Sequence, residues 1–207
     1  MSHGKFWSVW EHVRPDLYAT LQLKLFSEND LIDGWMRGQY DSETVCERLT
    51  SDLRVPAREV FDALILGCRK MVLDRGLVEQ LGELSGACKI VLVTDNMDCF
   101  TRFTVPAQNL SKHFHDILNS CDLGRLKKDD GGRTFKEYLK KEGLDFSQSL
   151  LIDDSESACE LFSALGGRSI KSRGVDHTIS VLGLLCDQDT FNADQGQLFS
   201  SKFQDRL

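Results

Sequence analysis

The sequence contains no run of about 18 uninterrupted apolar residues, the length that a membrane-spanning helix requires. Residues 1–6 include one lysine and no apolar segment of the kind that an export signal needs. Basic residues are not in excess either: 25 lysines and arginines stand against 32 aspartates and glutamates, for a net charge of -7. We therefore expect a cytoplasmic protein with no membrane partner and no nucleic-acid partner.

Closely spaced cysteines are also absent. The seven cysteines lie far apart in the sequence, so no CxxC pair is available for a metal or redox site. Scattered thiols in odd number are typical of the reducing cytosol. No cysteine is followed by an arginine six positions later, as a cysteine phosphatase would require. We therefore interpret Cys99, which lies close to the candidate site described below, as a packing residue.

The pattern of apolar residues differs between the two parts of the sequence. Between residues 6 and 84, apolar residues recur at helical spacing, which predicts four or five helices. From Cys88 onwards, short apolar runs alternate with helical stretches, which predicts a parallel sheet. A chain of 207 residues is long enough for one α/β core and one smaller unit. We therefore predict an α/β fold with a helical domain over residues 5–83, a core over 84–186 and a polar tail over 187–207.

Polar side chains follow three of the expected strands. The strand over residues 89–93 is followed by Thr94-Asp95-Asn96, and the strand over 149–152 is followed by Asp153-Asp154-Ser155. The strand over 116–120 leads to the pair Lys127-Lys128. Helices are expected over 133–142 and 178–185, and a weak last strand over 168–171. Ligands bind at the carboxyl ends of the strands in an open parallel sheet, so these side chains should converge.

The residue types in this set suit a phosphate and a magnesium ion. Asp153 and Asp154 supply the carboxylate oxygens that Mg²⁺ prefers. Lys127 can offset the charge of a phosphoryl group, and the Thr94 hydroxyl can hold its oxygens as charge shifts. Simpler interpretations stand beside these: the aspartates could cap the next helix, and Thr94 could merely end a strand.

At this point the sequence resembles the haloacid dehalogenase (HAD)-like hydrolase superfamily over residues 90–170. Ile90–Asn96 is similar to its second motif, and His113–Gly124 with Lys127 is similar to the stretch leading to its third. Leu150–Ser155, followed by a helix and Ala164–Gly167, is similar to its fourth. Three motifs in the right order make the resemblance specific.

The resemblance implies a Rossmann-like core with a parallel sheet and a helical cap. It implies a Mg²⁺-dependent phosphatase that acts on a small phosphorylated metabolite. Thr94, Asn96 and Lys127 would be its catalytic residues, and Asp153 and Asp154 would be its metal ligands. The family commonly has Pro after the lysine, whereas this sequence has Lys128 and an apparent insertion around Gly131-Gly132. Lys128 therefore stays open as the functional lysine.

The family's first motif has no counterpart before Lys89. That motif is an apolar strand ending in Asp-x-Asp, whose first aspartate is the nucleophile. Residues 5–83 resemble the cap that follows this motif, so we expect a chain that starts downstream of the nucleophile and lacks a strand near the middle of the sheet. The run Asp187-Gln188-Asp189-Thr190 could replace the motif in a permuted chain, but we favour the frayed end of a helix.

Two rival functions follow from this absence. The first is a non-catalytic HAD-like module that binds a ligand or a protein partner. The second is a haloacid dehalogenase, against which the Asp153-Asp154 pair counts. His113 and His115 lack a third metal-ligating partner and are interpreted as surface residues. The tryptophans of the helical region are interpreted as core residues and not as the lining of a substrate pocket.

Overall fold

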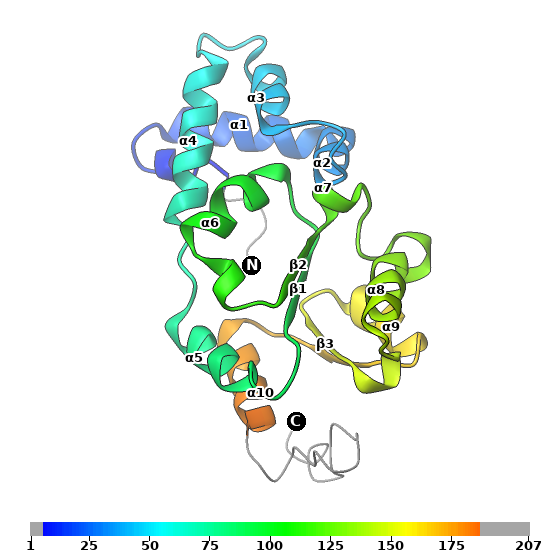
Figure 1. Ribbon diagram of the computed structural model, residues 1–207. Helices are drawn as coiled ribbons and strands as arrows, with labels where there is room; N and C mark the ends of the chain where they lie inside the picture. Colours follow the sequence, from blue (N-terminus) through cyan, green and yellow to red (C-terminus); the bar gives the residue numbers. More distant parts are fainter. Residues whose placement is uncertain (1–5, 187–207) are drawn as a thin grey trace. The chain divides into compact units, whose positions relative to one another are not determined.

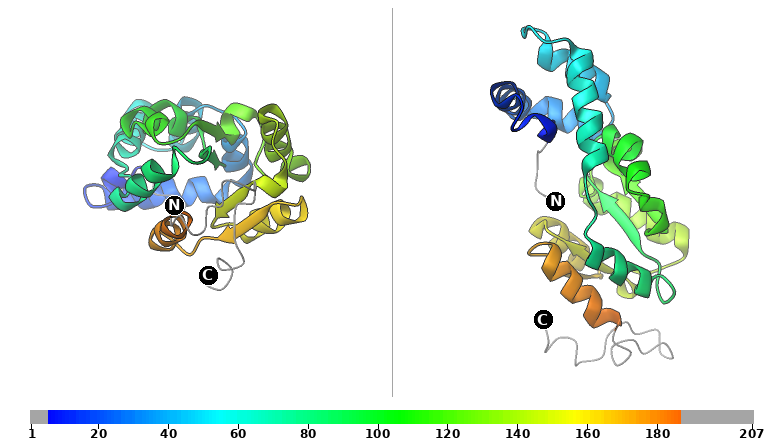
Figure 2. Two further views of the ribbon diagram at one scale, coloured as in Figure 1. Left: turned by 60° about the horizontal axis from the view of Figure 1, so that its bottom comes forward. Right: turned by 90° about the vertical axis from the view of Figure 1, so that its left-hand side faces the viewer.

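The computed structural model describes residues 6–186, which form two compact units (Figures 1 and 2). Within the described residues, unit 1 consists of residues 6–72 and 91–126, and unit 2 consists of residues 73–90 and 127–186. Each unit combines helices with one pair of parallel strands. Among residues 6–186, no helix has both the length and the apolar composition needed to cross a membrane.

Unit 1 begins with a helical region. A short 3-10 turn, Ser8–Trp10, precedes four helices: α1 (Pro15–Ser27), α2 (Asn29–Met36), α3 (Ser42–Thr50) and α4 (Ala57–Lys70). Local chemistry sets their ends. Pro15 opens α1, where its missing N–H costs nothing. The Asp41 carboxylate caps α3 by accepting from the Thr44 N–H at 2.8 Å.

The end of α2 depends on a glycine. Gly38 has φ of +69°, a conformation that side chains disfavour, and the Gln39 N–H turns back to the Gly34 carbonyl at 2.8 Å. A Cβ on Gly38 would lie 2.5 Å from the Cys121 carbonyl oxygen. This close backbone approach joins the end of α2 to the later part of unit 1.

The later part of unit 1 contains two parallel strands. β1 (Val91–Thr94) pairs with β2 (Asp116–Asn119), and Thr94 lies opposite Asn119. Between the strands lie a π-turn (Phe100–Thr104), α6 (Val105–Ala107) and a 3-10 turn (Leu110–Lys112); α7 (Ser120–Leu123) follows β2. The core of the unit is apolar and joins the helices to the loop after β1. Its buried members include Trp7, Leu21, Leu25, Trp35, Val45, Leu49, Val60, Leu64, Met97 and Cys99.

Unit 2 contains the second strand pair and four helices. β3 (Leu150–Asp153) pairs in parallel with β4 (Arg168–Lys171). The helices are α5 (Arg75–Leu84), α8 (Asp129–Glu142), α9 (Glu156–Ala164) and α10 (Val175–Cys186), with a 3-10 turn at Phe146–Gln148. α5 and α10 lie side by side, as Figure 2 shows. Phe135 of α8 packs edge-on against Phe162 of α9, with ring centroids 5.1 Å apart.

The predicted α/β class is confirmed. Five helices occupy the region before residue 85, and the four expected strands form within two residues of their predicted ends. The strands of the described residues form two separate two-stranded ladders, whereas one sheet was expected. The division into a helical domain over 5–83 and a core over 84–186 stays a prediction. The expected tail over 187–207, with Asp187-Gln188-Asp189-Thr190, lies outside the described residues.

A left-handed turn precedes the regular part of α8. The right-handed helix follows Gly132, which agrees with the expected start at Arg133. In the turn ahead of it, Asp130, Gly131 and Gly132 have φ of 51°, 62° and 79°. L-residues disfavour this conformation and glycine tolerates it, so the Gly131-Gly132 pair permits the turn. The apparent insertion noted in the sequence is therefore a left-handed turn directly after the two lysines.

Candidate functional site

A buried ion pair lies at the carboxyl end of β3. The Lys127 Nζ lies 2.5 Å from the Asp153 Oδ2, and the two side chains are 12% and 7% exposed. The other oxygen of the carboxylate, Oδ1, accepts from the Ser155 N–H at 2.8 Å. A buried carboxylate is stable only when it is paired and hydrogen-bonded, and Asp153 meets both conditions. The predicted meeting of Lys127 and Asp153 is present in unit 2.

The polar residues of the turn after β3 have different roles. Ser155 is the N-cap of α9, since its hydroxyl accepts from the Ala158 N–H at 3.4 Å. The alternative interpretation, in which the aspartates cap this helix, is therefore wrong for Asp153. Its side chain turns to Lys127 instead, while Asp154 is exposed. The sequence places the capping serine directly after the aspartates, so Asp153 remains available for other contacts.

The two adjacent lysines occupy different environments. The Lys128 side chain is exposed, and its Nζ donates to the Ser157 hydroxyl at 2.7 Å. Lys127 is the lysine that contacts a carboxylate at the end of a strand. A fixed positive charge beside a strand end suits a phosphoryl group better than a charge on a solvated surface, where screening weakens it.

Cys159 lies below the strand end. Its thiol is 3.6 Å from the backbone carbonyl oxygen of Asp153. Burial, followed by the negative charge of Asp153, raises the pKa of the Cys159 thiol. The Cys159 side chain is buried, at 6% exposed. We interpret it as packing against the turn.

Thr94 and Asn96 belong to unit 1. Thr94 is the last residue of β1 and is half-buried opposite Asn119. The Asn96 side chain serves its own loop, because its Oδ1 accepts from the Met97 N–H at 3.0 Å. The Asn96 N–H donates to the Ser120 hydroxyl at 2.9 Å. The loop after β1 is therefore held in shape by its own polar groups and by the end of β2.

Three polar residues around this loop, of which Asn119 and Ser120 are buried, were missed in the sequence. Asn119 is 1% exposed and donates through Nδ2 to the Met97 carbonyl at 3.0 Å and to the Thr101 hydroxyl at 2.9 Å. Its Oδ1 is buried and has no partner among the described residues. Ser120 and Asp98 hold the same loop. The polar pair Asn119-Ser120 directly after an apolar run was the available signal, of the same kind that identified Thr94 and Asp153.

The predicted site residues therefore lie in two groups, Lys127, Asp153 and Asp154 in unit 2 and Thr94 and Asn96 in unit 1. The convergence of these groups stays a prediction. Within residues 6–186, no cluster of three or more histidine, cysteine, aspartate or glutamate side chains is arranged to hold a metal. The donor chemistry still suits Mg²⁺, which commonly uses one or two carboxylates and keeps several waters. Asp153 and Asp154 could provide those oxygens.

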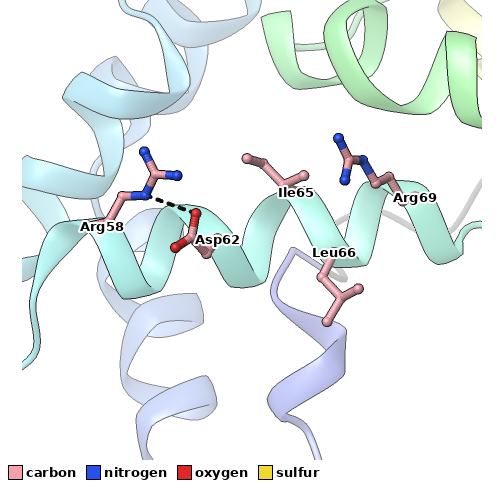
Figure 3. A pocket seen from close by; sticks show the side chains of 5 residues that line it. All are labelled: Arg58, Asp62, Ile65, Leu66 and Arg69. Carbon is pink, nitrogen blue, oxygen red and sulfur yellow. Dashed lines mark ion pairs between the residues drawn. The ribbon is translucent and has the colours of Figure 1, made fainter.

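Other candidate features are structural. Cys99 is 2% exposed in the core of unit 1, and its pKa is raised by hydrogen bonding with Cys68 and by burial, so its interpretation as a packing residue is confirmed. Trp7 and Trp35 are fully buried in the same core. A hollow of about 420 Å³ lies along α4, and all the side chains that line it come from one face of that helix (Figure 3). None of the predicted site residues lines it.

The sequence matches no family model and no curated protein. Solved structures do match. A HAD-family enzyme, BT-2542 of Bacteroides thetaiotaomicron, has a TM-score of 0.63 at 16% identity, over 79% of this chain and 88% of that chain. A HAD-like family hydrolase of Porphyromonas gingivalis has a TM-score of 0.63 at 16% identity, over 83% and 88%. The L-2-haloacid dehalogenase of Xanthobacter autotrophicus has a TM-score of 0.58 at 12% identity, over 86% and 81%.

These matches agree with the strand-end motifs that suggested the same superfamily from the sequence. Identities of 12–16% carry information about the fold and not about the substrate. This chain therefore has the fold of the HAD-like hydrolase superfamily.

Proposed function

We propose that this chain carries the magnesium- and phosphate-binding residues of a HAD-type phosphatase for a small phosphorylated molecule. The observation that carries the proposal is the buried contact between Lys127 and Asp153 at the end of β3. Carboxylate, ammonium and hydroxyl groups at strand ends are the combination that phosphoryl transfer requires. BT-2542 has also been crystallised with magnesium and inorganic phosphate, which supports the same ligand chemistry here.

Each residue has a role that follows from its chemistry. Asp153 and Asp154 would hold Mg²⁺ through carboxylate oxygens; when bound, the ion would neutralise charge on the phosphoryl oxygens. Lys127 would keep a positive charge beside Asp153 and the phosphoryl group. The Thr94 hydroxyl, with backbone N–H groups of the following loop, would hold the phosphoryl oxygens. The attacking carboxylate that such chemistry uses has no Asp-x-Asp counterpart before Lys89.

A second function uses the same residues. Lys127 and Asp153, paired at the end of β3, would also serve a non-catalytic module that binds a phosphorylated ligand. A haloacid dehalogenase ranks last, although one is among the similar structures. The adjacent carboxylates Asp153 and Asp154 favour a metal site, which a dehalogenase would not need.

We also propose a cytoplasmic location and a small-molecule partner. None of the seven cysteines, all within the described residues, forms a disulfide, which supports a reducing cytoplasm. The net charge of -7 argues against nucleic acid as a partner, because the phosphate backbone is itself negative. A small anion held by Lys127 and by Mg²⁺ remains compatible with that charge.

The test is hydrolysis of p-nitrophenyl phosphate by the purified chain, with and without Mg²⁺, beside an Asp153→Asn variant. Asparagine keeps the size of aspartate and removes the charge that binds the metal and Lys127. We expect inorganic phosphate to bind in the presence of Mg²⁺ and the variant to lose this binding, and we expect no hydrolysis, since the attacking carboxylate has no counterpart before Lys89. Mg²⁺-dependent hydrolysis would mean that a nucleophile exists within these residues, and neither binding nor hydrolysis in a folded sample would overturn both proposals.

A further inference from the structure

The Asp98 carboxylate collects donors from three elements of unit 1. Its Oδ1 accepts from the Trp35 indole N–H at 2.7 Å and from the Ser42 hydroxyl at 2.6 Å. Its Oδ2 accepts from the Ser42 backbone N–H at 3.2 Å and from the Arg102 guanidinium at 2.6 Å. The Asp98 side chain is 13% exposed. A carboxylate with this many donors is held in one position.

The donors have their own reasons to need this carboxylate. Trp35 of α2 is fully buried, so its indole N–H requires a partner inside the protein. Ser42 is the first residue of α3, where the backbone N–H has no acceptor within the helix and where an anion is favoured. Arg102 also forms two hydrogen bonds with Glu43 of α3, at 2.6 and 2.7 Å. Asp98 therefore accepts hydrogen bonds from polar groups of α2 and α3, and in this way it ties the loop to both helices.

The same loop is also held by the end of β2. The Ser120 hydroxyl accepts from the Asn96 N–H at 2.9 Å and donates to the carbonyl of Met36, the last residue of α2, at 2.7 Å. The Asn119 carboxamide donates to the Met97 carbonyl at 3.0 Å. The loop between Thr94 and Asp98 is thus connected to α2 in its middle, through Ser120, and at its end, through Asp98. Its conformation depends on the helices as well as on β1.

We propose that Asp98 is a positioning residue for the phosphoryl-binding loop. By holding the loop against α2 and α3, it sets where the Thr94 hydroxyl and the N–H groups of the loop lie. The inference rests on the proposed function, since it assigns a purpose to that loop. Asp98 itself need not touch the ligand. Its contribution to ligand binding passes through the geometry of Thr94 and Asn96.

The test compares Asp98→Asn with Glu43→Gln. The asparagine keeps an acceptor for one pair of donors and presents an NH₂ group to the other. Glu43→Gln weakens the remaining ion pair of Arg102 and leaves the contacts of Asp98 with Trp35 and Ser42 in place. The readouts are amide hydrogen exchange, the proton resonance of the Trp35 indole N–H, and titration with inorganic phosphate in MgCl₂.

We expect Asp98→Asn to speed exchange at Asn96 and Met97 on the order of tenfold, while Leu118 in β2 changes less than about twofold. The Trp35 resonance should shift, and the Kd for inorganic phosphate should rise roughly fivefold or more. Glu43→Gln should leave all three readouts within about twofold of wild type. If Asp98→Asn does not fold, Ser42→Ala, which removes one donor to Asp98, should give the same pattern with a smaller amplitude.

Two outcomes would overturn the inference: exchange that rises equally at Leu118 and in the loop, or exchange that does not change in the loop. The first would mean that Asp98 only stabilises unit 1. Failure of the wild-type chain to bind phosphate would remove the proposed function, and the exchange pattern would still decide whether Asp98 positions the loop.

Discussion

Replacing Lys127 by methionine should destabilise the protein far more than the same replacement at Lys128. Methionine keeps most of the apolar stem of lysine and removes the charge in both cases. At position 127 the change leaves the Asp153 carboxylate, whose side chain is 7% exposed, without its cationic partner. At position 128 the change removes an exposed contact with the Ser157 hydroxyl. The pair of variants therefore isolates the buried ion pair.

The magnitude follows from burial. Removing one partner of a buried ion pair costs about 3–5 kcal/mol, because the remaining charge is uncompensated. Asp153 retains its hydrogen bond from the Ser155 N–H at 2.8 Å, which places Lys127→Met at the lower end, about 3 kcal/mol. Lys128→Met should cost less than about 1 kcal/mol, as exposed contacts do. For a chain of this size, Lys127→Met should lower Tm by roughly 6–12 °C, and Lys128→Met by less than about 4 °C.

Thermal denaturation followed by circular dichroism measures both variants. The double variant Lys127→Met/Asp153→Asn should recover at least half of the loss, because it no longer buries an unpaired carboxylate. Equal destabilisation by the two lysine variants, or a larger effect at Lys128, would refute the assignment of the buried pair.

Two further predictions concern unit 1. Gly38→Ala should cost roughly 2–4 kcal/mol and Gly124→Ala roughly 1 kcal/mol. Both glycines have φ near +69°, but only at Gly38 would a Cβ meet a backbone atom, the Cys121 carbonyl oxygen. Equal decreases in Tm for the two variants would contradict this steric explanation. Hydrogen bonds from Arg102 lower the pKa of Glu43 below its usual value. The ionised Glu43 side chain therefore stabilises the folded protein above its unfolded pKa, and this contribution is lost as pH falls through the folded pKa. Urea titrations should therefore show wild type more stable than Glu43→Gln at pH 7 by less than about 1 kcal/mol, with the difference vanishing in acid; a constant difference at all pH values would contradict the pairing.

The elements of the fold could be predicted because each has a local signature. β1 and β3 are short apolar runs without a helical period, and both end within one residue of their predicted bounds. The left-handed turn at the start of α8 could not be predicted. It depends on packing as well as on glycine, since a Cβ on Gly132 would lie 3.0 Å from the Leu165 side chain. That contact joins residues far apart in the sequence.

The candidate site could be predicted only in part, for a similar reason. Lys127 and Lys128 are adjacent and chemically identical, so burial alone distinguishes them. Asp98 was missed because its environment comes from tertiary contacts. An aspartate after a strand looks the same in sequence whether it is solvated or satisfies an indole and a helix N-terminus. The order of the motifs in the sequence predicted the turn at Asp153. The residues that hold the loop after β1 are recognised only from their contacts in the structure.

We propose that Lys127 and Asp153 form a phosphate site that depends on Mg²⁺. Calorimetric titration of the folded chain with inorganic phosphate, with and without MgCl₂, tests this site when repeated on Asp153→Asn, Lys127→Met and Lys128→Met. We expect binding that requires Mg²⁺, is lost in the first two variants and is retained within about twofold in Lys128→Met. Binding that survives Asp153→Asn, or that disappears only in Lys128→Met, would contradict it.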